Sequence, residues 1–374
     1  MSRLLRHLAG GFAVLAATVP SPAKLYELIV RGGSGGGGHA ASALVHIWAS
    51  PNPPGAVFDR WTGDVDKVVD RYAAHTILVM PPAKIAITAV FKRAPAWKPS
   101  AETLEGVAVL SYFPPRHSGA IVLFHGNGGG ASAFLNAVEA RIFAADAVAA
   151  GYGLIALDSA DRERKVWNQQ PALDNPDVRR VKAVLAAFVQ RKQLKAGEPV
   201  YALGIASGGA FAAKAAFLLN FHAAAIYFAP GDTSPGSRVP TIWLMAQNDE
   251  LGKTDRNGDP RALANFSSLV SKGVAAKFNI NDPSPVYPLR FWRIPGLQPA
   301  DSAAIYQGLR EHGLLDAGGF LRDHPKDSPW RAAIPERFAR QAGAVREQLD
   351  VCFSAHRFYS DFDNRVIDFF NEHH

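Results

Sequence analysis

Short apolar runs alternate with polar, glycine- or proline-containing stretches along the chain, and the pattern changes near residue 92. Before that point the runs are rich in β-branched and aromatic residues and are bounded by Pro, Gly or Asp, which is typical of strands. The expected strands are Leu25–Val30, Ala43–Ala49, Val57–Trp61, His75–Met80 and Lys84–Phe91. A loop is expected at the glycine-rich residues 32–38. The pattern predicts a small all-β domain at residues 24–92, with Phe58 and Trp61 in its core.

After a proline-bearing linker at residues 93–99, strand-like and helix-like segments alternate. The expected strands are Val107–Phe113, Ala120–Phe124, Gly153–Leu157, Val200–Leu203, Ala223–Ala229, Thr241–Ala246 and Lys277–Ile280. The expected helices are Ala131–Ala149, Asp177–Arg191, Ala210–Leu219, Pro260–Lys272 and a last helix at Asp361–Asn371. This alternation predicts an α/β domain at residues 100–374, with a mostly parallel sheet and helices on both faces.

Residues 281–351 interrupt that alternation as a C-terminal insertion. Its aromatic residues include Phe291, Trp292 and Tyr306. They fit two arrangements, a lid or wall over a pocket and the ordinary packing of an extended subdomain.

The first residues, 1–23, fit a secretory signal peptide. Arg3 and Arg6 precede an uncharged apolar run from Leu8 to Val19, and small residues end the segment at Ala23. The run is too short for a comfortable membrane span, although an uncleaved anchor is the alternative. We therefore expect a secreted or periplasmic protein.

The net charge and the cysteine content bear on the expected partners and on disulfide bonding. Removal of residues 1–23 takes away two arginines and no acids, so the formal charge falls from +7 to +5. This modest excess, without long basic runs, argues against a nucleic-acid partner. The single cysteine, Cys352, cannot close an internal disulfide and is expected to be a small buried apolar residue.

The stretch Pro199–Lys214 reads as a strand, a glycine-rich turn and an alanine-rich helix. Gly204, Gly208 and Gly209 provide the small residues that so sharp a turn needs. This is the architecture of the G-x-S-x-G nucleophile elbow. The frame formed by Gly204 and Gly208 centres on Ala206, however, and the serine, Ser207, comes one position later.

Four motifs in the N-terminal part resemble the bacterial repeat domain related to the internalin B-repeat. They are Tyr26-Glu-Leu-Ile-Val30, the F-x-x-W-x-G-D sequence beginning at Phe58, Met80-Pro81 and Ile87-Thr-Ala-Val-Phe91. The resemblance implies a compact β domain that serves exported bacterial proteins as a spacer or adhesion module, and it assigns no chemistry. Contact with a cell surface or a polymer is therefore one possible role of this domain.

The remainder resembles the α/β-hydrolase superfamily in three motifs that occur in the expected order. These are Ile121-Val-Leu-Phe-His-Gly-Asn-Gly-Gly129, Gly204-Ile-Ala-Ser-Gly-Gly209 and Trp243-Leu-Met-Ala-Gln-Asn-Asp249. The resemblance implies an orienting acid at Asp249, which follows a strand, and a catalytic histidine in the loop before the last helix. His356 occupies that position, and His324 is the second choice.

Backbone amides after the strand at residues 120–124 are expected to stabilise an oxyanion, because a glycine-rich turn there leads into a helix. We place these donors at Gly126 or Asn127 and at the amide that follows the nucleophile, which is Gly208 if Ser207 is the nucleophile. A dinucleotide-binding turn is the alternative, with Asp158 as the ribose-binding acid, but Asp158 is too far along the chain for that fingerprint. No cofactor and no metal site is expected.

Two functions remain open. The first is an exported serine hydrolase, an esterase or depolymerase acting on a small or polymeric ester through Ser207, His356 and Asp249. The second is an inactive hydrolase-fold protein that binds a ligand or surface partner, because Ala206 at the elbow apex offers no hydroxyl. A membrane partner is not expected once residues 1–23 are removed.

Overall fold

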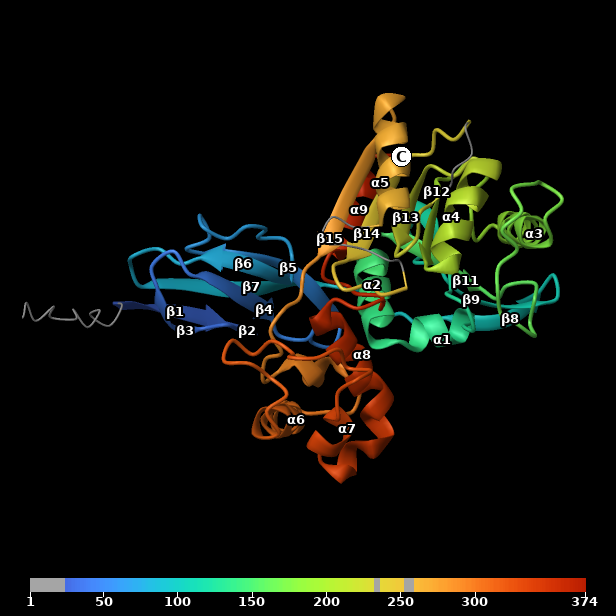
Figure 1. Ribbon diagram of the computed structural model, residues 1–374. Helices are drawn as coiled ribbons and strands as arrows, with labels where there is room; N and C mark the ends of the chain where they lie inside the picture. Colours follow the sequence, from blue (N-terminus) through green and yellow to red (C-terminus); the bar gives the residue numbers. More distant parts are fainter. Residues whose placement is uncertain (1–23, 232–235, 252–258) are drawn as a thin grey trace, which may run out of the picture.

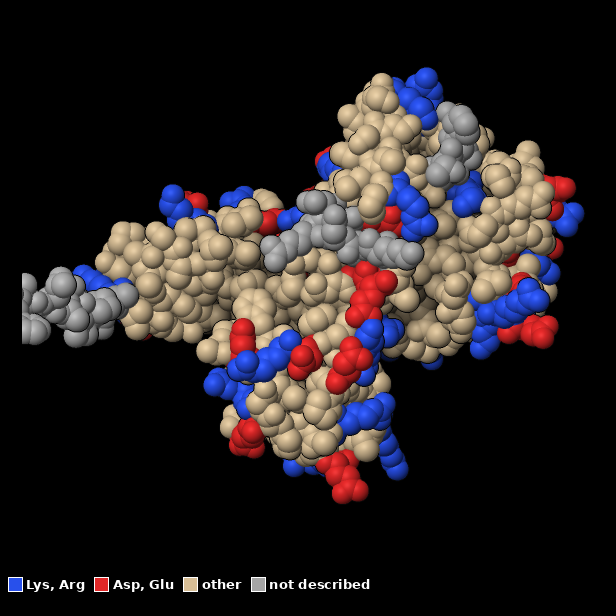
Figure 2. Space-filling model, in the orientation of Figure 1, with Lys and Arg blue, Asp and Glu red and all other residues tan. Residues whose placement is uncertain are grey.

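The computed structural model describes residues 24–231, 236–251 and 259–374. The predicted signal peptide, residues 1–23, lies outside the described residues. Within them, every helix is too short or too polar to span a bilayer. Charges of both signs are interspersed on the face shown in Figure 2, as the modest net charge leads one to expect.

The N-terminal domain consists of two small sheets. One has the order β3 (Gly37–Ala40), β1 (Leu25–Arg31), β7 (Ile85–Arg93) and β5 (Ala56–Gly63), and the other has the order β2 (Gly33–Ser34), β4 (Leu44–Ala49) and β6 (His75–Val79). The all-β prediction is confirmed. Trp61 is completely buried in its core and donates its indole N–H to the Ala73 carbonyl at 3.0 Å.

The prediction of a loop at residues 32–38 is wrong in part, because this segment contains β2 and the start of β3. A β-carbon on Gly33 would come within 2.4 Å of the Trp48 carbonyl oxygen, and one on Gly35 within 2.3 Å of the His46 carbonyl oxygen. The glycines thus allow a close approach of backbones to β4. Without side chains they leave no apolar alternation from which strands could be predicted.

The larger domain is built on one sheet, whose strands are listed here in spatial order. They are β15 (Ala276–Asn281), β14 (Thr241–Ala246), β13 (Ala223–Tyr227), β12 (Val200–Ile205), β10 (Gly119–Phe124), β11 (Tyr152–Leu157), β9 (Val107–Tyr112) and β8 (Ser100–Leu104). The strands from β15 to β11 are parallel, whereas β9 is antiparallel to both of its neighbours. The prediction of a mostly parallel sheet is confirmed.

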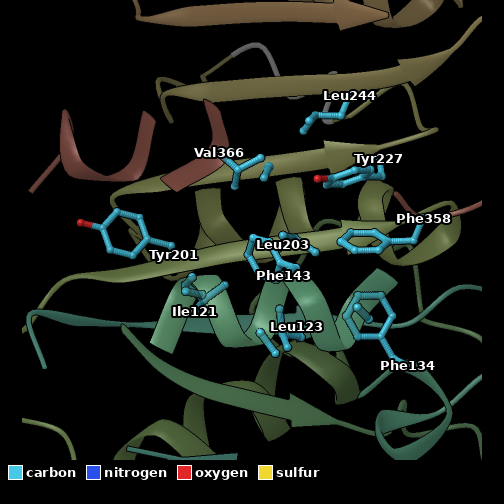
Figure 3. Close-up of a cluster of buried hydrophobic side chains, with 14 of the residues drawn as sticks. Ile121, Leu123, Phe134, Phe143, Tyr201, Leu203, Tyr227, Leu244, Phe358 and Val366 are labelled. Carbon is cyan, nitrogen blue, oxygen red and sulfur yellow. The ribbon is translucent and has the colours of Figure 1, made fainter. Parts of the chain in front are cut away.

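Helices cover both faces of this sheet (Figure 1). On one face, β10 contributes Ile121 and Leu123 to a core that includes Phe143 of α2 (Val138–Ala149) and Val366 of α9 (Asp363–Asn371). Figure 3 shows this cluster. On the other face, the alternate residues of β10, whose side chains point to the opposite side of the sheet, pack against α3 (Pro176–Gln190) and α4 (Ser207–Leu218). The helix α5 (Pro260–Ser271) packs against β15 and β14 at one edge of the sheet.

The single helix expected at residues 131–149 is wrong, because the chain breaks it at Ala137 into α1 (Ala131–Asn136) and α2. Ala137 has an extended ψ of 144°. The carboxylate of Glu347 accepts the amides of Val138 and Glu139, at 3.3 and 3.2 Å, and so caps the start of α2. This cap comes from a distant part of the chain, and no Gly or Pro marks the break.

Residues of the insertion form a helical subdomain below the sheet in Figure 1. Its elements are η1 (Arg290–Arg293), α6 (Pro299–Glu311), α7 (Trp330–Ala333), η2 (Glu336–Gln341) and α8 (Ala342–Phe353). They share a hydrophobic cluster in which Phe291 is completely buried and Tyr306 packs at the edge. For these two side chains, ordinary packing is therefore the correct alternative. Cys352 is buried in the same cluster, as expected.

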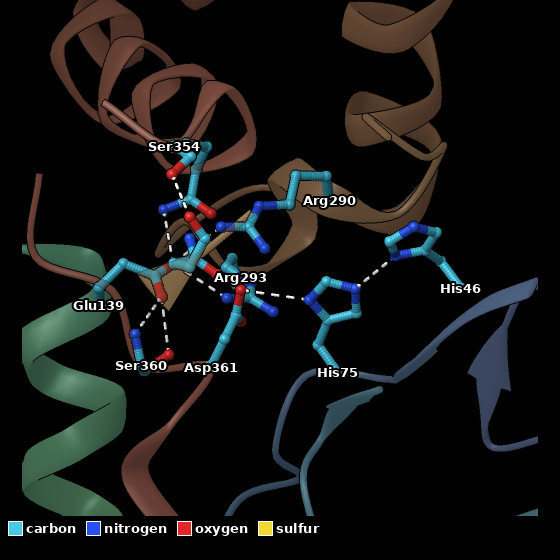
Figure 4. Close-up of polar contacts among 10 residues, drawn as sticks. His46, His75, Glu139, Arg290, Arg293, Ser354, Ser360 and Asp361 are labelled. Atoms are coloured by element: carbon cyan, nitrogen blue, oxygen red, sulfur yellow. Dashed lines mark hydrogen bonds and ion pairs between the residues drawn. The ribbon is translucent and has the colours of Figure 1, made fainter. Parts of the chain in front are cut away.

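The β domain packs directly against the larger domain. Trp48 stacks on Tyr287 with ring centroids 4.2 Å apart. His75 Nδ1 lies 3.2 Å from Asp361 Oδ2, and its Nε2 lies 2.9 Å from Nδ1 of His46 (Figure 4). These contacts join the two domains in addition to the linker.

Candidate active site

The turn between β12 and α4 places Ala206 at its apex. Ala206 has φ 53° and ψ −120°, a left-handed backbone that residues with a β-carbon rarely adopt. Its amide donates to the Tyr227 carbonyl at 2.9 Å on the neighbouring strand. Such strain is tolerated where the surrounding structure determines the backbone.

The two framing glycines fix this geometry. A β-carbon on Gly204 would lie 2.1 Å from the Gly208 carbonyl oxygen, and one on Gly208 would lie 2.3 Å from the His125 carbonyl oxygen. Both distances are far below van der Waals contact, with backbone atoms on both sides. Gly209 is less tightly enclosed, since its nearest neighbour, the Gly204 carbonyl oxygen, would be 3.0 Å away. The frame therefore centres on position 206.

Ser207 is the first residue of α4 and does not share the pocket of Ala206. Its Oγ is buried and has no hydrogen-bond partner among the described residues. Ser207 lines a neighbouring hollow with Gln169 and Lys214, whereas Ala206 lines the pocket that contains His356. The elbow thus presents a methyl group to that pocket.

His356 and Asp249 form the pair expected from the sequence. The two residues are 107 positions apart, and His356 Nδ1 lies 2.8 Å from Asp249 Oδ1. Asp249 is 1% exposed, so the carboxylate is shielded from water. With Nδ1–H donated to the carboxylate, Nε2 is the imidazole nitrogen left to exchange a proton with a reactant.

A set of hydrogen bonds that the sequence did not reveal holds the His356 loop against the end of β14. Ser354, in a left-handed conformation at the end of α8, accepts the Gln247 amide at 2.9 Å and donates to the Asn281 carbonyl at 2.6 Å. Asn248 donates its side-chain N–H to the Phe353 carbonyl at 2.7 Å. The positive φ of Ser354, at the end of α8 and two residues before His356, is visible only in the structure. No local sign of these hydrogen bonds was therefore present in the sequence.

Two other histidines that follow Asp249 in the chain have local partners. The ring of His324 lies 4.9 Å from that of Phe353, and its Nδ1 accepts the Lys326 amide. His312 ends α6 and bonds the Gly308 carbonyl, as expected of a helix C-terminus. Of the two histidines proposed as the base, the structure pairs His356 with Asp249.

The expected oxyanion loop, Gly126 and Asn127, lies opposite the elbow. A β-carbon on Gly126 would be 3.7 Å from that of Ala206. Within the described part of the chain, the amides of Asn127 and Ser207 have no acceptor. With Ala206 at the apex, the amide that follows the elbow residue belongs to Ser207 and not to Gly208.

His125 supports this loop. Its Nδ1 lies 2.7 Å from the Gly126 carbonyl oxygen, and its Nε2 accepts the Ser159 amide at 3.2 Å. Burial lowers the pKa of His125, which favours a neutral ring with one donor and one acceptor nitrogen. Its role in the loop is therefore structural.

The pocket between these groups has a volume of about 340 Å³. Its apolar wall was not identified from the sequence. It includes Phe134, Ala137, Ile205, Leu251 and Phe358, and Glu347 and Arg357 also line it. An apolar cavity with a few convergent polar groups suits a small molecule that carries one polar function.

Two alternatives to acyl chemistry, a metal site and a dinucleotide site, depend on particular side chains. Across residues 24–231, 236–251 and 259–374, no group of three or more His, Cys, Asp or Glu side chains could hold a metal ion. Asp158, the acid of the dinucleotide alternative, accepts the Ala131 amide at 2.8 Å and pairs with Arg162 at 2.9 Å. Asp158 thus caps the first turn of α1.

Three features identify the architecture of the larger domain: its strand order, its strained elbow and the His356–Asp249 pair. The larger domain has the α/β-hydrolase fold. Residues 26–95 match the family model of the divergent InlB B-repeat domain. No curated protein matches the chain.

The comparison with solved structures found partial likenesses, and esterases are among them. Thermogutta terrifontis esterase 2 is 14% identical, with a TM-score of 0.36, and the match covers 49% of this chain and 82% of that one. An S-formylglutathione hydrolase from Agrobacterium tumefaciens is 13% identical, with a TM-score of 0.37, over 49% and 86% of the two chains. These likenesses are distant, and the fold assignment rests on the strand order and elbow of this chain.

Proposed function

We propose that this protein binds a small ester- or acyl-like compound in its α/β-hydrolase pocket without hydrolysing it. The observation that carries the proposal is Ala206 at the elbow apex, in the same pocket as His356. Acyl transfer needs a nucleophile there, and a methyl group has no proton to transfer to a base.

The rest of the machinery supports recognition of a carbonyl group. The amides of Asn127 and Ser207 would donate to a carbonyl or carboxylate oxygen, as they would to an oxyanion. The imidazole of His356, oriented by Asp249, would donate or accept a hydrogen bond through Nε2. The apolar wall would hold the hydrocarbon part of the same ligand.

Hydrolysis by Ser207 is the second candidate, and its supporting observation is that the Ser207 Oγ has no hydrogen-bond partner among the described residues. A nucleophilic role would require the turn to shift by one residue. The glycine frame opposes that shift, and Ile205 would then stand where the frame requires a small residue. Burial of the Oγ also opposes attack on a substrate.

A binding experiment tests the first candidate. N-(4-nitrophenyl)butyramide, an amide analogue of a short-chain ester, should shift the imidazole NMR signals of His356. The signals of His222, which lies near Val200 at the start of β12, should stay unchanged as an internal control. Absence of a His356 shift at millimolar amide would contradict the proposal, as would release of 4-nitrophenol from 4-nitrophenyl butyrate by the unmodified protein.

Export and surface contact belong to the same proposal. The signal-like residues 1–23 support a secreted or periplasmic location, and the match to a divergent InlB B-repeat domain at residues 26–95 supports contact of the β domain with a cell surface or polymer. N-terminal sequencing of protein recovered outside the cytoplasm would test the location.

A further inference from the structure

A further pocket, of about 370 Å³, lies where the β domain meets the larger domain. Its walls come from β5, β7 and the loop before β6 on one side, and from α2 and the start of α9 on the other. It is distinct from the pocket at Ala206. Neither the fold nor the proposed function assigns it a role.

The charge of this pocket is unbalanced. Among the described residues, five carboxylates and a single cation, Lys92, line it. The carboxylates are Asp59, Asp146, Asp361, Asp363 and Asp368. Asp59 pairs with Arg60 and lies 3.9 Å from Lys92, while Asp361 pairs with His75.

Asp363 and Asp146 form no ion pair of this kind within the described part of the chain. Asp363 is 3% exposed, and neither of its carboxylate oxygens has a hydrogen-bond partner among the described residues. The Oδ1 of Asp146 is likewise buried without a partner in that part of the chain. A buried carboxylate without a donor is costly, so two of them in one cavity point to a cationic ligand.

The surroundings select the kind of cation. The donor sets of the described residues do not suit a metal ion, and the cavity is far larger than one. Apart from the polar residues Ser360 and Asn364, its other walls are apolar or aromatic and include Val57, Phe58, Tyr72 and Ile367. Aromatic faces and hydrocarbon walls suit the alkyl part of an organic ammonium ion, and the carboxylates suit its charged end.

We propose that the pocket at the domain junction binds a small alkyl ammonium compound, with Asp363 and Asp146 as its anionic partners. Val57 and Phe58 belong to the β domain and Asp363 to the larger domain, so the ligand contacts both. The β domain thereby gains a role in binding.

The same carboxylates link binding to proton release. Burial raises the pKa of Asp146 to about 7, with Lys92 acting in the opposite direction. Burial and the neighbouring carboxylates Asp146, Glu139 and Asp361 raise the pKa of Asp363, against the effect of Arg293. Near pH 7 the pocket therefore holds a proton that an incoming cation displaces.

Calorimetry of the full chain with 1,4-diaminobutane at pH 7 tests the proposal. We expect binding accompanied by proton release, seen as a difference in heat between phosphate and Tris buffers. Asp363→Asn should weaken binding at least tenfold and reduce the proton release. Asp66→Asn, the same change at an exposed acid of the β domain, should leave both unchanged.

A variant that should strengthen binding, instead of weakening it, distinguishes an effect on binding from general damage to the fold. Lys92→Met removes the resident cation and should strengthen diamine binding. No binding to the unmodified protein at 10 mM diamine would overturn the proposal. So would equal binding by the unmodified protein and Asp363→Asn, or weaker binding by Lys92→Met.

Discussion

The carbonyl oxygen of Gly208 occupies the space that a side chain on Gly204 would need, at 2.1 Å from a β-carbon built there. The two glycines therefore bring the end of β12 and the start of α4 together and force the turn at Ala206. Because both contacting groups are backbone, the clash cannot be relieved by a change of rotamer.

Gly204→Ala should destabilise the protein by more than ~3 kcal/mol, since overpacking against fixed backbone exceeds the usual cost of an added methyl group. Urea denaturation would measure the change in the free energy of unfolding. Gly343→Ala is the matched control, because a β-carbon on Gly343 in α8 meets open space. That variant should be stabilised by about 0.5–1 kcal/mol, and equal effects of the two changes would contradict the frame.

A buried ionic cluster around Glu139 holds Ser360, which follows His356 in the same loop. Glu139 is completely buried, and its Oε1 lies 3.3 Å from Arg290 and 2.9 Å from Arg293. Its Oε2 accepts the amide and hydroxyl of Ser360, at 3.0 and 2.7 Å (Figure 4). Burial alone would raise the pKa of Glu139, but the two arginines outweigh it and hold the pKa below its usual value.

Glu139→Gln should cost about 3–5 kcal/mol, the range for removing one partner of a buried ion pair. Two arginines would then be left without their carboxylate. Glu311→Gln, an exposed change near the end of α6, should stay within about 0.5 kcal/mol of the unmodified protein. Thermal and urea unfolding of the two variants side by side would check this difference.

The domain junction should make stability depend on pH. Burial, followed by the neighbouring His75, lowers the pKa of His46 from 6.5 to about 4. Since the unfolded chain then binds more protons than the folded one, stability is fully present above pH 6.5 and is lost as the pH falls toward 4. Asp361 acts in the same direction: burial would raise its pKa, but His75 and the nearby arginines outweigh burial and lower it.

Replacement of His46 by Gln should therefore reduce the loss of stability between pH 7 and pH 4.5. The measurement is the free energy of unfolding from urea denaturation at both pH values. His312→Gln, at an exposed helix end, should retain the full pH dependence. An identical pH dependence of His46→Gln and the unmodified protein would show that His46 does not contribute.

Regular apolar periodicity made most of the fold predictable from the sequence. The central strands β10, β11, β13 and β14 are continuous buried runs, and α3 begins at an Asn175 cap followed by Pro176. The β2 and β3 strands were missed because glycine carries no side-chain pattern. The break at Ala137 was missed because the Glu347 cap comes from a residue more than 200 positions away.

Site residues could be predicted only where their place relative to a strand or helix is typical of a role in the site. Asp249 and His356 follow from their places after a strand and before the last helix, and the structure brings them together. The pocket walls at Phe134 and Phe358 depend on the tertiary packing of α1 against the His356 loop, which no local pattern reveals. The placement of Ser207 outside the His356 pocket likewise needed the backbone geometry of the elbow.

The measurement that tests the central claim most directly is the esterase activity of Ala206→Ser and Ser207→Ala with 4-nitrophenyl butyrate. A hydroxyl at position 206 would face the His356–Asp249 pair and the amides of Asn127 and Ser207. Ala206→Ser should therefore raise the rate at least about a thousandfold and accept a fluorophosphonate label at position 206. Ser207→Ala should remain as inactive as the unmodified protein. Brisk hydrolysis by the unmodified protein that is lost in Ser207→Ala would contradict the account.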